Sequence, residues 1–192
     1  MNNQNSFNTK PQPSQDQILV MIIDHQEKLL PHILGHESIL QKVSRLLKFC
    51  SLLSLPITAT EQYPAGLGPT VAPIADLLTG HVSTFHKTTF SCMKDERISQ
   101  HLSGSGRRCV VISGIETHIC VQQTVCDLLA ASYCVHVLAD CVGSRSELDH
   151  DTGLERMRNA GATVSTLEAF MFEVLGSCKH PLFKRFLSEI MK

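Results

Sequence analysis

Six short apolar runs that alternate with longer segments of helical periodicity are the feature that most limits how this chain can fold. The runs are rich in β-branched residues and have the length of buried strands; they cover residues 18–23, 57–60, 82–85, 109–113, 135–139 and 163–165. Segments with apolar residues at helical spacing include residues 39–53, 71–78, 120–132 and 147–160. This alternation predicts right-handed crossovers between parallel strands, and therefore an α/β fold with helices on both faces of the sheet.

The length and composition of the chain predict one domain. Its 192 residues, of which 43% are hydrophobic, are enough for one compact core but cramped for two. Residues 1–16 are rich in Asn, Gln, Ser and Pro and cannot bury enough apolar surface to offset the entropy of ordering them. We therefore expect a flexible tail over residues 1–16 and a single domain over residues 17–192, with a short amphipathic helix within residues 181–192.

The balance of charges argues against a polyanionic partner. Lys and Arg together number 17 against 18 for Asp and Glu, which gives a formal net charge of -1. Neither nucleic acid nor an anionic membrane surface is therefore expected as the main partner, and the apolar run at residues 18–23 is far too short to span a bilayer. A small-molecule substrate is compatible with this balance, because the local field of a site can differ from the total charge.

Eight cysteines raise the question of disulfides, but the sequence around them does not favour a disulfide framework. The chain is too long for a small disulfide-stabilised domain, and residues 1–17 lack the basic and apolar segments of a secretory leader. We expect reduced thiols in a cytoplasmic protein, most of them as small core residues.

Polar residues follow three of the predicted strands at the point where each strand ends. Asp24 follows the first run, Lys87 closely follows the third, and a loop from Gly114 to Cys120 follows the fourth. Ligands of an open parallel sheet bind beyond the carboxyl ends of its strands. The sequence therefore predicts that an acid, an amine and a thiol meet at one edge of the sheet.

These three groups have the chemistry of a cysteine nucleophile. Cys120 lies where a loop gives way to a helix, and both the helix dipole and the Lys87 ammonium favour a thiolate there. Asp24 is placed to accept the thiol proton and return it to a leaving group. Taken alone, each residue has a plainer interpretation: a buried cysteine, a helix N-cap and a surface lysine.

Four runs of the sequence resemble the isochorismatase-like hydrolases, in order, between about residues 18 and 172. The runs are Ile22-Ile23-Asp24-His25-Gln26, Thr60-Glu61-Gln62-Tyr63-Pro64-Ala65-Gly66-Leu67-Gly68-Pro69-Thr70, His86-Lys87-Thr88-Thr89-Phe90-Ser91 and Ser113-Gly114-Ile115-Glu116-Thr117-His118-Ile119-Cys120-Val121. The resemblance is greatest to the isochorismatase-domain branch with the Glu-Gln-Tyr-Pro block. It implies a three-layer α/β/α sandwich with a six-stranded, mainly parallel, doubly wound sheet, and a homo-oligomer, as a dimer or larger.

The same resemblance assigns roles to residues of this chain. The family's catalytic Asp, Lys and Cys fall on Asp24, Lys87 and Cys120. A cis peptide that many members have would fall at Ile115–Glu116, and the N–H groups of Glu116 and Cys120 would form the oxyanion hole.

From the sequence, no metal or cofactor is expected in this protein. Metal-binding nicotinamidases of the family have an Asp-x-His pair and a further His after the second strand, where this chain has Glu61-Gln62-Tyr63-Pro64. The histidines offer no helical His-x-x-x-His, and no Gly-x-Gly-x-x-Gly follows the first strand. His118, two residues before Cys120, is interpreted as a loop residue with a hydrogen-bonded ring rather than a base.

Three side chains near the strand ends are candidates for the substrate pocket, namely Tyr63, Phe90 and Ile119; each is also compatible with simple closure of the core. The expected reaction is hydrolysis of a small amide or other C–N bond through an acyl-enzyme on Cys120. Two alternatives are vinyl ether hydrolysis of the isochorismatase type, and a non-catalytic protein of the same fold that uses Cys120 as a redox sensor.

Overall fold

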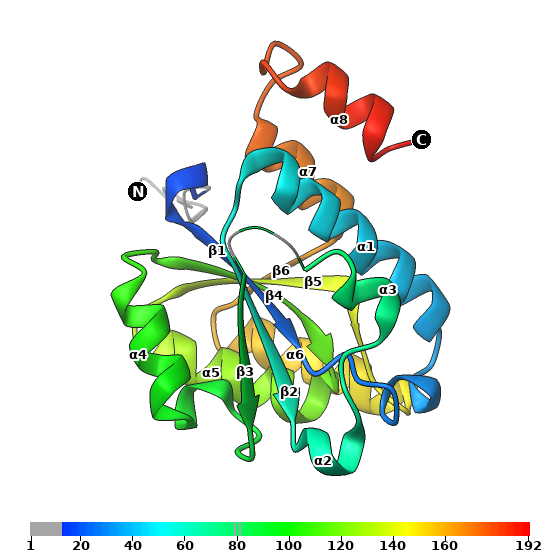
Figure 1. Cartoon of the computed structure of the whole chain (residues 1–192). Helices are drawn as coiled ribbons and strands as arrows, with labels where there is room; N and C mark the ends of the chain where they lie inside the picture. The colour runs from blue at the N-terminus through cyan, green and yellow to red at the C-terminus, as the bar shows by residue number, and fades with distance from the viewer. Residues whose placement is uncertain (1–12, 79, 81) are drawn as a thin grey trace, which may run out of the picture.

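A six-stranded, all-parallel sheet is the centre of the protein in a computed structural model that describes residues 13–78, 80 and 82–192. The spatial order is β3-β2-β1-β4-β5-β6 (Figure 1). The strands are β1 (Ile18–Ile23), β2 (Ile57–Gln62), β3 (Val82–Lys87), β4 (Cys109–Ile115), β5 (Cys134–Gly143) and β6 (Thr163–Ser165). The chain builds one half of the sheet outward from β1, then returns to start the other half at β4, which is the doubly wound order.

Helices cover both faces of the sheet, so the fold is the predicted three-layer α/β/α sandwich. One face packs against α1 (His36–Leu53), α3 (Ala72–Ala75), α7 (Leu167–Leu175) and α8 (Phe183–Glu189). The other packs against α4 (Glu96–Gly104), α5 (Gln122–Ala130) and α6 (Glu147–Asn159). Side-chain oxygens of Asp95, Ser146 and Thr166 cap the starts of α4, α6 and α7.

The central strand β1 explains why a strand of this fold is apolar throughout. Alternate side chains of a strand point to opposite faces, and both faces of β1 are covered. Ile18, Val20 and Ile22 join the core beneath α1 and α7, whereas the intervening Leu19, Met21 and Ile23 join the core beneath α4, α5 and α6. All six are buried.

The elements agree with the sequence pattern in order and type, and differ at their ends. The runs at 18–23 and 163–165 have the same bounds as β1 and β6, while β2, β3, β4 and β5 are each longer than the predicted run. Only Ala72–Ala75 of the predicted segment 71–78 is helical, and α8 occupies part of residues 181–192. A short helix α2 (Pro64–Leu67) follows β2, and a π-helical turn η4 (Thr117–Val121) precedes α5.

The first described residues contact the folded domain. The turn Gln15–Gln17 overlaps the end of the tail expected over residues 1–16: Nε2 of Gln15 donates to the carbonyl of Leu53 at 2.7 Å. Residues 1–12 of that expected tail lie outside the described residues.

All eight cysteines lie in the described part and are free thiols. In the same part, no helix combines the length and apolar character needed to cross a membrane.

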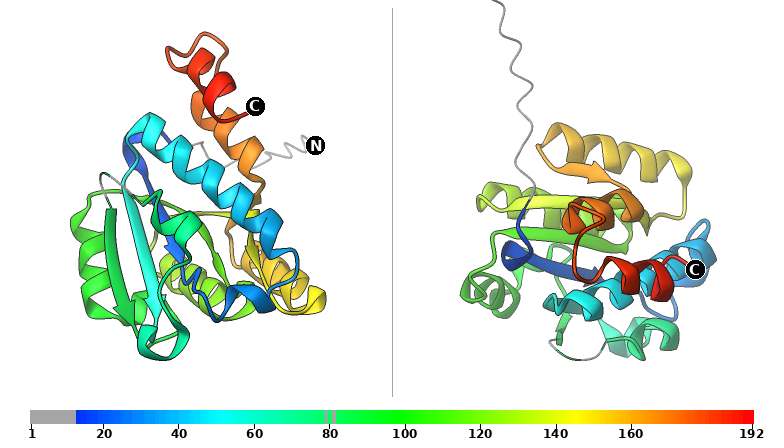
Figure 2. Two further views of the ribbon diagram at one scale, coloured as in Figure 1. Left: turned by 45° about the vertical axis from the view of Figure 1, so that its right-hand side comes forward. Right: turned by 90° about the horizontal axis from the view of Figure 1, so that it is seen from above.

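The two ends of the sheet have different surroundings. The carboxyl ends of the strands lie on the side of α2, and α8 lies at the opposite end, beyond α7 (Figures 1 and 2). Phe186 of α8 packs edge-on against Phe49 of α1, with ring centroids 5.8 Å apart. The C-terminal helix thus extends the core away from the edge where Asp24 and Cys120 lie.

Candidate functional site at the carboxyl edge of the sheet

Asp24 is the first residue after β1 and is completely buried. Its backbone has a positive φ of 56°, which turns the chain sharply out of the strand, and its N–H donates to the carbonyl of Thr60 at 3.0 Å. Oδ1 accepts a hydrogen bond from Oγ1 of Thr60 at 2.7 Å, and Oδ2 accepts one from Nζ of Lys87 at 2.7 Å. The carboxylate is therefore held on both oxygens.

Lys87 is the last residue of β3, so the structure places it within the strand rather than after it. Besides Asp24, its Nζ donates to Oε1 of Gln62 at 2.7 Å and lies 3.2 and 3.3 Å from the carbonyl oxygens of Thr89 and Phe90. Burial is the largest single effect on the pKa of Lys87 and lowers it, but the charge of Asp24, the neighbouring thiols Cys92 and Cys120, and the hydrogen bond to Asp24 together outweigh burial, so the pKa is raised. The side chain is thus held as an ammonium.

Cys120 lies in the turn η4 rather than at the free start of a helix, and only 6% of its surface is exposed. Burial raises the pKa of the Cys120 thiol well above the ordinary range. The negative charge of Asp24 and a hydrogen bond to Asp24 raise this pKa further, whereas the positive charge of Lys87 lowers it. The sequence pattern predicts a thiolate here, but burial and the carboxylate outweigh the ammonium. The resting group is a protonated thiol next to a carboxylate that can accept its proton.

The peptide between Ile115 and Glu116 leads from β4 into this turn and is cis. The carboxylate of Glu116 points to the loop after β5, where Oε2 accepts from both N and Nε of Arg145 at 3.1 Å. The carbonyl of Glu116 accepts from the N–H of Ile119 at 3.1 Å. The backbone that precedes the thiol is therefore anchored from outside the site.

A second thiol, Cys92, lies beside the same groups and was not predicted to do so. Its Sγ is 4.0 Å from Oγ1 of Thr60, the hydroxyl that binds Asp24. The hydroxyl of Thr124 accepts from the N–H of Cys92 at 3.0 Å and donates to the carbonyl of Cys120 at 2.7 Å. Burial raises the pKa of Cys92 to about 11, against the opposing effect of Lys87.

Sequence reasoning also missed Gln62 and Gln26. Gln62 is directly opposite Lys87 in the register of β2 and β3, so the strand pairing brings the two side chains together. Buried Gln26 fixes Gln62 in turn: its Oε1 accepts from the N–H of Gln62 at 2.7 Å, and its Nε2 donates to the carbonyl at 2.9 Å. The position of Gln62 at the end of a parallel strand was the available signal.

The three candidate pocket residues lie around the site at different depths. Tyr63 and Phe90 are exposed, at 57% and 55%, and Ile119 is half-buried against the core beneath α5. The backbone N–H of Tyr63 donates to the carbonyl of Lys87 at 2.9 Å. His118 has the predicted hydrogen-bonded ring, with Nδ1 at 3.0 Å from Oγ of Ser144, but it lies in the turn η4 rather than in a loop.

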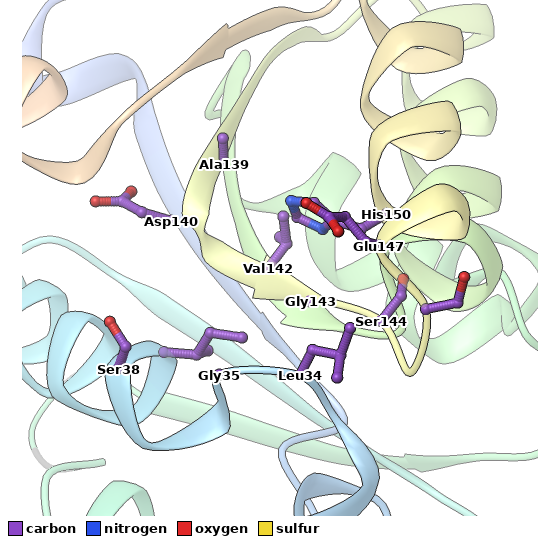
Figure 3. A pocket seen from close by; sticks show the side chains of 12 residues that line it. Leu34, Gly35, Ser38, Ala139, Asp140, Val142, Gly143, Ser144, Glu147 and His150 are labelled. Carbon is purple, nitrogen blue, oxygen red and sulfur yellow. The ribbon is translucent and has the colours of Figure 1, made fainter.

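A cavity of about 420 Å³ opens between the start of α1, the carboxyl-terminal part of β5 and the start of α6 (Figure 3). Leu34, Gly143, Glu147 and His150 are among its lining residues, and Tyr63, Phe90 and Ile119 are not. Nδ1 of His150 is 3.0 Å from Oγ1 of Thr117, the first residue of η4. One residue of the cavity wall, His150 of α6, is therefore hydrogen-bonded to the turn that contains Cys120.

Comparison with known proteins places the chain in a family. Residues 17–169 match the isochorismatase domain. Isochorismatase domain-containing protein 2 of Xenopus laevis is 37% identical over 174 residues, which cover 91% of this chain and 83% of that protein.

Solved structures agree with this assignment. The MAR1 ribonuclease from Caenorhabditis elegans has a TM-score of 0.89 and 35% identity, with 95% of this chain and 93% of that chain covered. YcaC from Pseudomonas aeruginosa, solved with hexane-2,5-diol and covalent acrylamide, shares the fold at a TM-score of 0.89 and 20% identity, with coverage of 97% and 94%. On the sequence match and the curated relative together, the chain belongs to the isochorismatase family.

Proposed function

We propose that this protein is a cysteine-dependent hydrolase that cleaves a small amide or other C–N bond through an acyl-enzyme on Cys120. The observation that carries the proposal is that one buried carboxylate, Asp24, is hydrogen-bonded to the Lys87 ammonium and lies close enough to the Cys120 thiol to raise its pKa. A base that lies beside both a cation and a nucleophile is the arrangement that nucleophilic catalysis requires.

In the proposed first half-reaction, Sγ of Cys120 attacks the carbonyl carbon while Asp24 takes the thiol proton. Attack converts the carbonyl oxygen into an oxyanion, which accepts hydrogen bonds from the backbone N–H groups of Glu116 and Cys120. The C–N bond then breaks, and Asp24 returns its proton to the leaving nitrogen. Free amine or ammonia departs, and the acyl group remains on Cys120 as a thioester.

The second half-reaction uses the same groups on water. Asp24 accepts a proton from a water molecule as the water oxygen attacks the thioester carbonyl. Collapse of this adduct breaks the C–S bond, and the proton on Asp24 passes to the departing sulfur. The carboxylic acid product leaves, and the thiol of Cys120 and the carboxylate of Asp24 are restored. Throughout, Lys87 stays an ammonium and keeps the carboxylate in position.

We propose a small substrate, with no metal or cofactor in catalysis. Both Asp24 and Lys87 are shielded from solvent, which suits a compact ligand better than a polymer. The name of the Caenorhabditis elegans relative raises RNA as a substrate, but the net charge of -1 of this chain does not favour a polyanion. We further propose one domain over residues 17–192, a cytoplasmic homo-oligomer, and Tyr63, Phe90 and Ile119 at the substrate.

A substrate panel with matched variants tests the proposal. Wild type, Cys120→Ala and Cys178→Ser would be assayed on small primary amides, ureido compounds, isochorismate and RNA. Cys178 is exposed and serves as the cysteine control. We expect ammonia release from an amide or ureido compound by wild type and Cys178→Ser only, with the acyl-enzyme visible by intact mass. Acrylamide, covalently present in the YcaC structure, serves as a small-amide probe and should modify Cys120 in both wild type and Cys178→Ser.

The other outcomes separate the alternatives. Isochorismate cleavage that survives in Cys120→Ala would identify vinyl ether hydrolysis, because protonation at carbon and attack by water do not need the thiol. Cleavage of RNA that is lost in Asp24→Asn would identify a ribonuclease. Reversible oxidation of Cys120 without turnover of any substrate would identify a redox sensor.

A further inference from the structure

A second cluster of reactive side chains lies at the opposite end of the sheet from Asp24 and Cys120. Cys109 is the first residue of β4, Cys134 is the first residue of β5, and the two are directly paired in the strand register. His136 is two residues further along β5, so its side chain is on the same face of the sheet as that of Cys134. Strand pairing thus places two thiols and an imidazole side by side.

The donor atoms of these three residues are close enough for a shared ligand. The two sulfur atoms and one ring nitrogen of His136 all lie within 4.8 Å of one another. Within residues 13–78, 80 and 82–192, this is the one group of three or more His, Cys, Asp or Glu side chains that is so arranged.

The surroundings restrict what that ligand can be. Cys109 and His136 are buried, and the His136 ring packs against Phe170 of α7 with centroids 6.2 Å apart. Cys134 is half-buried and gives the cluster a route to solvent. An ion bound here must carry its charge into an apolar core, so the ligands have to neutralise it.

We propose that Cys109, Cys134 and His136 bind a zinc ion. Two thiolates and a neutral imidazole cancel the double positive charge of Zn²⁺, and the two displaced thiol protons pass to solvent. Sulfur and nitrogen are the donors that Zn²⁺ prefers, at about 2.3 Å and about 2.0–2.1 Å. A tetrahedral ion then needs donors about 3.4–3.8 Å apart, which small side-chain rotations provide, and water from the side of Cys134 completes the shell. This site is separate from the proposed catalysis and does not depend on it.

Cobalt titration of the full chain tests the proposal, because Co²⁺ takes the place of zinc and its bond to thiolate is coloured. Protein freed of metal by a chelator under reducing conditions would be titrated with CoCl₂ and then with ZnCl₂. We expect thiolate-to-cobalt charge-transfer absorption that saturates at one equivalent and disappears when zinc is added. Cys134→Ser should weaken the affinity by about tenfold or more, whereas Cys120→Ala and Cys178→Ser should leave it unchanged.

Peptide mapping of the wild-type chain gives an independent result that needs no variant to fold. With zinc bound, Cys134 should react with iodoacetamide more slowly than in the zinc-free protein, while exposed Cys178 reacts equally in both. The proposal is overturned if no charge-transfer absorption develops, if Cys134→Ser leaves it unchanged, or if Cys120→Ala removes it. A disulfide between Cys109 and Cys134 that forms in the presence of zinc would also overturn it.

Discussion

Nζ of Lys87 lies 2.7 Å from Oδ2 of Asp24, and neither side chain is exposed to solvent. Each charge depends on the other, because removal of one partner of a buried pair leaves the other uncompensated. The pair supports both the fold, by joining β1 to β3 across β2, and the proposed chemistry, by fixing a carboxylate beside a thiol.

Replacement of Lys87 by methionine should strongly destabilise the protein. The Asp24 carboxylate would keep the hydrogen bond from Thr60 but lose its counter-ion, at a cost of about 3–5 kcal/mol in the free energy of unfolding. Urea denaturation measures the loss. Lys94→Met is the matched control: Lys94 is 69% exposed and pairs with Asp127 at 3.7 Å, so its loss should cost at most about 1 kcal/mol. Equal losses in the two variants would contradict the importance of the buried pair.

The alkylation rate of Cys120 should report the raised pKa of its thiol. In wild type the rate should begin to rise only above the ordinary thiol pKa of about 8.5, because burial and Asp24 both oppose the thiolate. Asp24→Asn removes a negative charge and should move the pH profile to lower pH, whereas Lys87→Met removes a positive charge and should move it to higher pH. Iodoacetamide kinetics with peptide mapping measure the profile. A shift to higher pH in Asp24→Asn would be the opposite of this prediction.

Gln62 should act as a positioning residue for Lys87. Gln62→Leu removes the amide oxygen that accepts from Nζ, and a hydrogen bond to a charged group is worth about 1.5–3 kcal/mol. Gln15→Leu is the control, because exposed Gln15 donates to a neutral backbone carbonyl and should cost only about 0.5–1.5 kcal/mol. Urea denaturation compares the two. Gln62→Leu should also shift the alkylation profile of Cys120, which a change of stability alone would not do.

Buried His25 should make the protein less stable in mild acid. The hydroxyl of Ser113 donates to the carbonyl of Cys141, so Nε2 of His25 donates to that hydroxyl, and Nδ1 has no hydrogen-bond partner among the described residues. A second proton would create a buried, unpaired charge, and burial lowers the pKa of His25 to about 4.

The sign of this pH dependence follows from linkage. Between about pH 6.5 and pH 4 the unfolded chain binds a proton that the folded chain does not, so stability should fall by about 1.4 kcal/mol for each pH unit as the pH is lowered. His25→Phe should lack this component, and a change at exposed His32, such as His32→Gln, should retain it. Urea denaturation at pH 7.5, 5.5 and 4.5 measures the difference. An unchanged slope in His25→Phe would exclude His25 as the cause.

The sequence was sufficient to place the strands and to bring Asp24, Lys87 and Cys120 to one edge, because each of these depends on local pattern and on the direction of parallel strands. It was not sufficient for contacts that depend on register. Gln62 reaches Lys87 because β2 and β3 pair in one particular alignment, and Cys92 reaches Thr60 through a loop. The sequence pattern also could not predict the direction of the pKa shift of Cys120, because that direction depends on how completely the thiol is buried.

Because β1 lies at the centre of the sheet, the site of Asp24, Lys87 and Cys120 should be assembled late in folding. Asp24 binds a lysine that follows it by 63 residues, and Cys120 arrives from β4 on the other side of β1. Contacts between such distant segments form only after the intervening loops have closed. During synthesis, domains fold as units, so an emerging chain that lacks β4 holds the future base and ammonium without the proposed nucleophile Cys120. Incomplete or unfolded copies of the protein should therefore not react with the substrate, and no inhibitory segment is needed to prevent that reaction.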